Sequence, residues 1–153
     1  MNAESIIKGR MAGLIVSLML QEAGYSVFRY GYEGIPETLA QIGTLKKKNT
    51  LNLLASTPHF VVTDKKREEV FLVGIKFQAE GASGRSIPWG LAELVKFWPY
   101  ADLLVVRTVA PFFFVLQQKE GCAIKTIPLN EGVLKVSSEL IKKYGQLARK
   151  FLA

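Results

Sequence analysis

The chain begins with apolar residues at three- and four-residue spacing, a pattern typical of a helix that packs against a core. This segment covers residues 4–23, and Gly24 follows it at the position of a helix C-cap. Its apolar positions are Ile6, Ile7, Met11, Leu14, Ile15, Leu18 and Met19. We therefore predict a long buried helix here.

A second helical pattern closes the chain at residues 131–152. Its apolar residues recur at helical spacing and would lie on one side of a helix. The opposite side would carry the basic residues Lys135, Lys142, Lys143, Arg149 and Lys150. This arrangement predicts an amphipathic helix that covers the core with one face. Two shorter segments predict further helices: residues 37–48, which Gly43 interrupts, and residues 88–98, which open with a proline.

Short runs of β-branched, aromatic and other apolar residues lie between the helical segments and predict strands. They cover residues 25–30, 59–64, 70–77, 101–107, 112–117 and 123–127. Charged turns join the second run to the third and the fifth to the sixth, which predicts two hairpins. The run ADLLVVR is apolar almost throughout, as expected of a strand buried on both faces.

The order of these elements predicts an α/β fold with a central mixed β-sheet flanked by helices. The long helices need a sheet face to cover, and the run at 101–107 follows a helix that can serve as a crossover. A chain of 153 residues is the size of one ordinary domain, so we expect a single domain over residues 1–153.

The net charge of +7 favours polyanionic partners, with nucleic acid first and an acidic protein or an anionic membrane second. A basic surface without a polyanionic partner is an equally simple explanation. The single cysteine, Cys122, excludes an intramolecular disulfide and a cysteine-rich zinc site, and it suggests a cytoplasmic protein. The apolar stretch at residues 11–20 is too short to span a bilayer, so we expect no membrane association.

Four short motifs carry a resemblance to a known family: Lys8-Gly9-Arg10, Ala23-Gly24-Tyr25, Thr57-Pro58-His59-Phe60 and Val73-Gly74-Ile75-Lys76. In these motifs, and in its order of elements over residues 4–107, the chain resembles the PD-(D/E)XK nuclease-like superfamily. The resemblance implies a restriction endonuclease-like fold, with an α-β-β-β-α-β core to which this chain adds a C-terminal hairpin and helix.

Active members of that family hold Mg²⁺ with an aspartate after the proline and an acidic residue two positions before the lysine. Magnesium requires such hard oxygen ligands. Here the two positions are His59 and Gly74, and Gly13 stands where the first helix often supplies a glutamate. Lys76 and Gln78 are the polar residues that remain. The resemblance therefore implies a degenerate site with no cofactor and without metal-dependent phosphodiesterase activity.

Other acidic residues would have to replace the missing ligands in an active enzyme. Asp64, Glu80 and Glu93 are the candidates: Asp64 ends the second strand, Glu80 lies four residues past Lys76, and Glu93 lies on the following helix, from which its side chain could reach back. With them the protein would be a Mg²⁺-dependent nuclease with a relocated site. On the sequence alone we leave the question of enzymatic activity open.

Basic clusters on predicted turns suggest a surface that contacts phosphates without a metal. The candidate nucleic-acid-binding residues are Lys46, Lys47, Lys48, Lys65, Lys66, Arg67 and Arg85. Our first hypothesis is therefore a non-catalytic nuclease-like protein that binds nucleic acid, most simply DNA. A non-catalytic protein-interaction module is the third possibility, and the apolar run at residues 111–115 is compatible with a homo-oligomer.

Overall fold

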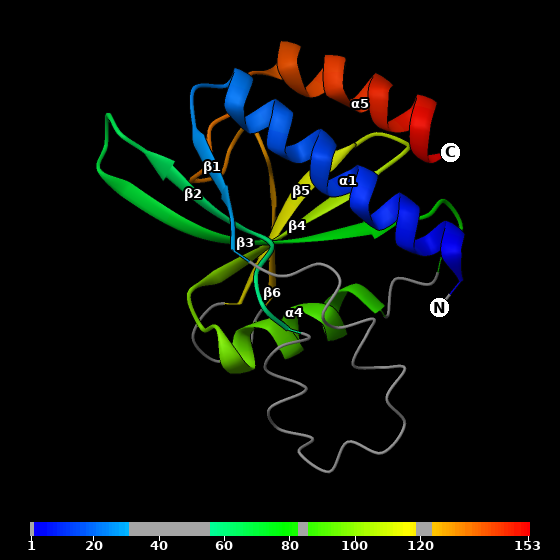
Figure 1. Cartoon of the computed structure of the whole chain (residues 1–153), viewed down its shortest axis with the longest axis horizontal. Coiled ribbons are helices and arrows are strands. Elements are labelled where there is room, and N and C mark those ends of the chain that lie inside the picture. The colour runs from blue at the N-terminus through cyan, green and yellow to red at the C-terminus, as the bar shows by residue number, and fades with distance from the viewer. Residues whose placement is uncertain (1, 31–55, 83–85, 119–123) are drawn as a thin grey trace.

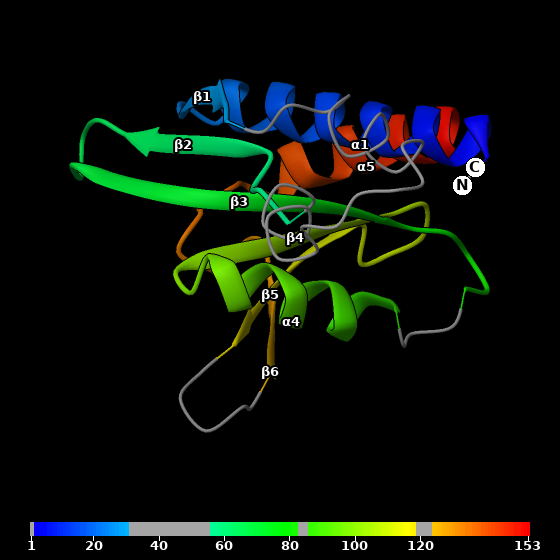
Figure 2. The same ribbon diagram turned by 60° about the horizontal axis from the view of Figure 1, so that its bottom comes forward.

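The computed structural model describes residues 2–30, 56–82, 86–118 and 124–153, apart from the side chains of residues 86, 88 and 89. Within these ranges one six-stranded sheet carries α1 and α5 on one face and α4 on the other (Figures 1 and 2). The predicted α/β fold with a central mixed sheet is thus confirmed. The bounds of the elements are α1 Ala3–Glu22, β1 Ser26–Arg29, β2 Phe60–Asp64, β3 Glu69–Gln78, α4 Ser86–Phe97, β4 Ala101–Arg107, β5 Phe113–Gln118, β6 Ile124–Pro128 and α5 Ser138–Leu152.

The strands follow one another across the sheet in chain order. β1, β2 and β3 pair antiparallel, β3 and β4 pair parallel, and β4, β5 and β6 pair antiparallel again. A parallel pair cannot be joined by a tight turn, so the chain crosses the sheet through α4 between β3 and β4. This crossover places α4 over the half of the sheet that contains the predicted site.

The two faces of β3 contribute to different parts of the core. Val73 and Ile75 belong to the large cluster under α1 and α5, whereas Gly74 lies against Leu94 of α4. Since neighbouring strand residues point to opposite faces, Lys76 projects to the same side as Gly74. The predicted lysine therefore lies on the α4 face of the sheet.

The predicted long helix is present as α1, but only one side of it is buried. Ile15, Val16 and Met19 pack into the core, but Leu14 on the opposite side is 56% exposed. Ile7 and Leu18 are exposed as well. The reason is that α1 forms an outer layer of the molecule, which leaves one side without a neighbouring layer (Figure 2). No helix in the part of the chain that the structure describes is long and apolar enough to cross a membrane.

The last helix begins at Ser138, later than the predicted start at residue 131. Ser137 caps it, because its hydroxyl oxygen accepts a hydrogen bond from the Leu140 N–H at 3.2 Å. The preceding segment is held as a loop, in which the Lys135 N–H donates to the Tyr25 hydroxyl oxygen at 2.7 Å. Leu134 and Val136 are buried, but they reach the core from this loop, and Val133 is exposed.

The other predicted elements match the structure to within a few residues where the structure describes them. α4 begins two residues earlier than its proline suggested, and β3 is longer than predicted. The predicted helix at residues 37–48 and the turn between β5 and β6 lie outside the described residues.

Candidate functional site

His59 stands at the start of β2 and is bonded to β3 through both its backbone and its side chain. Its N–H donates to the Val73 carbonyl at 3.0 Å, and its ring Nδ1 accepts from the Ile75 N–H at 3.0 Å. A backbone N–H can only donate, so Nδ1 must carry a lone pair and the neutral ring keeps its proton on Nε2. The histidine at the motif position of the aspartate therefore serves as a partner for the β3 backbone.

Gly74, at the position of the second acidic ligand, lies in close contact with apolar side chains. A Cβ atom there would lie 3.0 Å from Leu94 Cδ2 and 3.4 Å from Leu103 Cδ1. Any larger side chain would have to displace Leu94, which is buried in the core under α4. The space that a metal-binding carboxylate would need is filled by core packing.

Lys76 and Gln78 follow Gly74 on the same face of β3, and both are half-buried. Their cross-strand neighbours on β4 are Val105 and Arg107. The structure thus brings the four motif positions, His59, Gly74, Lys76 and Gln78, to the C-terminal half of β3.

The proposed replacement ligands do not form a cluster with Lys76. Asp64 pairs with Glu69 at the opposite end of β3, about 23 Å from Lys76 along the strand. Its carboxylate accepts hydrogen bonds from Arg67 Nε at 2.7 Å and from the Lys66 N–H at 3.0 Å. The bond from Arg67 is the main reason why the pKa of Asp64 is lowered. Asp64 therefore stabilises the hairpin turn.

Glu80 is exposed beyond the end of β3, and Glu93 is half-buried on α4. Within the described ranges no group of three histidine, cysteine or acidic residues is placed to hold a metal ion. Lys76 is a cation, and His59 offers a ring nitrogen that is already bonded to the β3 backbone. Neither residue is a suitable ligand for Mg²⁺, which prefers oxygen atoms.

The tip of the β2–β3 hairpin carries three of the predicted nucleic-acid-binding residues. Lys65 and Lys66 are exposed and form no ion pair with another described residue. Arg67 is different, because it bonds to Asp64, to the Tyr25 hydroxyl oxygen at 3.1 Å and to the Val133 carbonyl at 3.3 Å. Exposed Glu68 reduces the positive charge of the tip. The other candidates, Lys46, Lys47, Lys48 and Arg85, lie outside the described residues.

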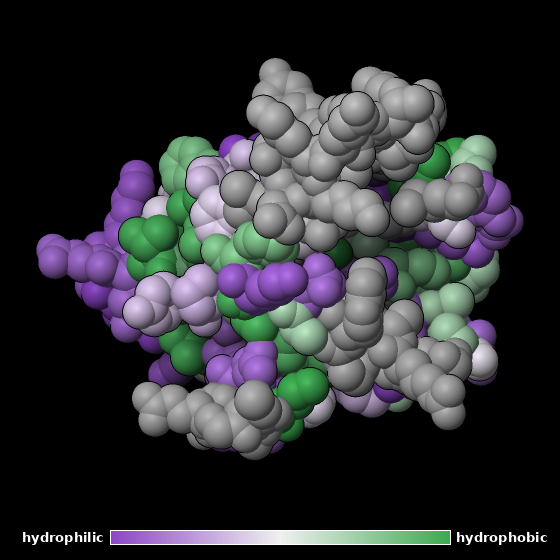
Figure 3. All heavy atoms as spheres, turned by 90° about the horizontal axis from the view of Figure 1, so that it is seen from below, coloured by the Kyte–Doolittle hydropathy of each residue, from purple (hydrophilic) through white to green (hydrophobic). Residues whose placement is uncertain are grey.

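An exposed apolar surface on the α4 side of β1, β2 and β3 did not follow from the sequence. We call it the open sheet face; Phe28, Tyr30 and Val70 are its exposed members, and Val61 and Leu72 beside them are half-buried. Phe28, Val61 and Leu72 form one row across the three strands. Phe28 is 56% exposed and Val70 is 66% exposed. Figure 3 shows this side of the molecule, with hydrophobic residues next to the strongly hydrophilic hairpin tip at the left.

The open sheet face connects the two groups of predicted site residues. Its outer end at Val70 adjoins the tip with Lys65 and Lys66, and its inner end at Tyr30 adjoins His59, because the Tyr30 N–H donates to the His59 carbonyl at 3.0 Å. In the sequence, the alternation of Phe28 and Tyr30 with Val27 and Arg29 could have indicated that the two aromatic side chains share one face of the strand. It could not reveal that, among the described residues, α4 packs mainly on β3, β4 and β5 and that Phe28, Tyr30 and Val70 stay exposed.

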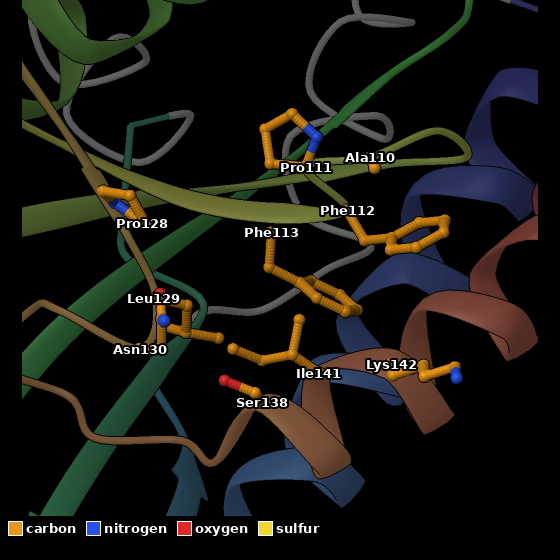
Figure 4. Close-up of a pocket in the computed structure, with 10 residues that line it drawn as sticks. All are labelled: Ala110, Pro111, Phe112, Phe113, Pro128, Leu129, Asn130, Ser138, Ile141 and Lys142. Carbon is orange, nitrogen blue, oxygen red and sulfur yellow. The ribbon is translucent and has the colours of Figure 1, made fainter.

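A pocket of about 230 Å³ lies on the other face of the sheet, between α5 and the ends of β5 and β6. Its lining is mostly apolar, with Phe113 and Ile141 pointing toward each other and the Lys142 side chain directed away from Pro128 and Leu129 (Figure 4). Because no set of polar groups converges in it, we do not regard this pocket as a reactive site.

Two further polar clusters connect elements of the fold. Glu22 on α1 accepts hydrogen bonds from Lys143 Nζ at 2.8 Å and from the Tyr144 hydroxyl at 2.5 Å, and the latter bond raises the pKa of Tyr144 to about 12. Asp102 on β4 accepts from Gln117 Nε2 at 2.9 Å, and burial raises its pKa. Asp102 lies on the face of the sheet opposite to Lys76, since it pairs with Val73, and Glu22 belongs to α1, which covers that opposite face.

Comparison with known proteins identifies no relative: no family model and no curated protein matches the chain.

Proposed function

We propose that the protein binds nucleic acid without metal-dependent cleavage, and that it is a PD-(D/E)XK-like protein whose metal site has been replaced. The order of elements and the position of Lys76 near the end of β3 are what the resemblance implies. DNA is the first candidate ligand, and a cytoplasmic location stays an expectation from the sequence.

The proposal that the protein does not use a metal ion is supported by the packing at Gly74, where core side chains fill the space of an acidic ligand. Leu94 lies 3.0 Å from the place of a Cβ at Gly74, so an acidic side chain would not fit without rearrangement. A single substitution is then insufficient to restore the site. Without a cluster of metal-binding carboxylates among the described residues, the negative charge that develops on a cleaved phosphodiester would lack its usual metal partner.

The support for nucleic-acid binding is electrostatic. The chain has a net charge of +7, and Lys65, Lys66 and Lys76 lie at the two ends of the open sheet face. Phosphate contacts from such cations release counterions, so the affinity must fall as salt is added.

The test is fluorescence anisotropy with a labelled DNA duplex over a range of salt concentrations in the presence of EDTA. We expect a linear fall of the logarithm of the association constant with the logarithm of the salt concentration. Replacing both Lys65 and Lys66 with alanine should reduce the slope by about 2, since each phosphate contact contributes about 0.9. The control variant replaces Lys142 and Lys150, which are exposed on α5, the helix on the face of the sheet opposite to α4 (Figure 2), and should keep the slope.

The active-nuclease alternative is tested with plasmid and single-stranded DNA in Mg²⁺ or Mn²⁺. Cleavage that requires the metal and is lost in Lys76→Ala would refute the proposal and point to Glu80 or Glu93 as ligands. If the protein neither binds nor cleaves nucleic acid at low salt, the proposal fails in favour of a protein-interaction module. A homo-oligomer is compatible with either outcome.

A further inference from the structure

We infer that the open sheet face binds unpaired bases of a single-stranded nucleic acid by stacking them on Phe28 and Tyr30. The inference rests on the proposed function and specifies its ligand. Its starting point is the exposure of aromatic rings on a sheet, where a soluble monomer normally buries them.

The two aromatic side chains have the spacing and the support that a stacking platform needs. Phe28 lies on the edge strand β1 and Tyr30 directly follows its end, where the Tyr30 N–H still donates to the His59 carbonyl. Continued extended backbone places the two side chains on the same face, about 7 Å from each other. Phe28 is 56% exposed and Tyr30 is 48% exposed. The Tyr30 ring is held by an edge-on contact with Trp98, with 5.5 Å between the ring centroids and an interplanar angle of 89°. Tyr30 is thereby oriented before any ligand binds.

Cations at both ends of the face can bind the phosphates that accompany the bases. Lys65 and Lys66 lie beyond Val70, and Lys76 lies about 20 Å from Val70 along β3. Proteins that bind single strands combine such a charged track with aromatic platforms, and each stacked base contributes to the affinity.

The same features favour a single strand over the other possible occupants. A duplex hides the faces of its bases, so Phe28 and Tyr30 could not stack on them without unwinding it. A second copy of the chain bound face to face would bring Lys65, Lys66 and Lys76 of the two copies close together, and their repulsion would oppose the contact. Lipid headgroups would engage the lysines and offer the rings no flat partner.

The test measures binding of labelled oligothymidylate, oligouridylate and a blunt duplex, each of about 12 nucleotides, a length within the range of known single-strand sites. We expect at least one of the single strands to bind more tightly than the duplex. Phe28→Ala should weaken that binding about 5- to 100-fold and leave duplex binding unchanged, whereas Phe28→Tyr should retain it. The preference between the deoxy and ribo strands distinguishes DNA from RNA.

The matched control is Phe151→Ala, which removes a phenylalanine of similar exposure, 48%, from α5 on the other side of the sheet. It should leave all affinities unchanged. If Phe28→Ala leaves single-strand binding intact while duplex binding remains salt-dependent, the inference fails and the proposed function stands. If the wild type binds no nucleic acid at low salt, both fail. If light scattering shows a dimer that Phe28→Ala dissociates, the face binds a second copy and the inference is wrong.

Discussion

Among single residues, Gly74 shows how packing decides what a motif position can do. Gly74→Glu should lower the free energy of unfolding by about 1–3 kcal/mol, because the side chain must displace Leu94 or bury its charge beside it. Urea denaturation measures the loss. In Gly74→Glu/Leu94→Ala the added space should make the glutamate less costly than it is beside Leu94. An unchanged stability of Gly74→Glu would show that the strand relaxes freely at this position.

Asp102 is a half-buried carboxyl group whose raised pKa lowers stability at neutral pH. Burial disfavours its charged form in the folded protein, so stability is lost as the pH rises from about 4 through the raised pKa. Asp102→Asn keeps an oxygen that accepts from Gln117 and removes the charge. We expect the variant to match the wild type near pH 3 and to be more stable by about 1 kcal/mol at pH 7.

Urea unfolding at several pH values tests this prediction. A stability difference that does not change with pH would mean that the buried charge is not its cause. Gln117→Ala serves as a second probe, because removing the donor should raise the pKa of Asp102 further and strengthen the pH dependence.

Because α1 has a buried and an exposed side, it allows the effect of burial on stability to be compared within one helix. Val16 is fully buried and Leu14 is 56% exposed, although both belong to the same apolar stretch. We expect Val16→Ala to lower the free energy of unfolding by about 2 kcal/mol and Leu14→Ala to change it by less than about 0.5 kcal/mol. Chemical denaturation of the two variants measures both values. Similar losses would mean that the outer side of α1 is covered in solution.

Close packing of α5 against the Phe112 ring depends on Gly145, which has no side chain to collide with the ring. A Cβ at Gly145 would overlap the Phe112 ring, over which Arg149 also lies at 5.3 Å. Gly145→Ala should therefore lower the melting temperature, although alanine favours helix formation by about 1 kcal/mol. If Phe112→Leu restores part of the loss in the double variant, the overlap is its cause. A stabilised single variant would contradict the packing.

In the whole molecule, Arg67 connects parts of the chain that are distant in sequence. It bonds to Asp64 in its own hairpin, to Tyr25 before β1 and to Val133 in the loop before α5. We expect Arg67→Ala to lower the melting temperature by several degrees, whereas the neighbouring Lys65→Ala should leave it unchanged. Thermal unfolding followed by circular dichroism distinguishes the two. Equal effects would mean that the bonds of Arg67 are not needed for the fold.

Local patterns along the chain were sufficient to predict most of the described helices and strands and the mixed sheet. Hydrophobic periodicity depends on which residues can be buried together within one element, and that information is contained in neighbouring positions. The same reasoning placed His59, Gly74, Lys76 and Gln78 at adjoining strands. It failed at the start of α5, where a capping serine and a hydrogen bond to Tyr25 hold residues as a loop despite their helical spacing.

Contacts between distant segments decided what those residues do. From the sequence, His59 fits a ligand and a structural partner equally, and the Ile75 N–H beside its Nδ1 makes it a structural partner. Arg67 fits a phosphate contact in the sequence, but in the structure it bonds to Tyr25 and Val133. The exposure of Phe28 likewise depends on how far α4 extends over the sheet. Side-chain chemistry is set by each residue alone, but the availability of a side chain for a ligand depends on neighbours that only the folded chain brings together.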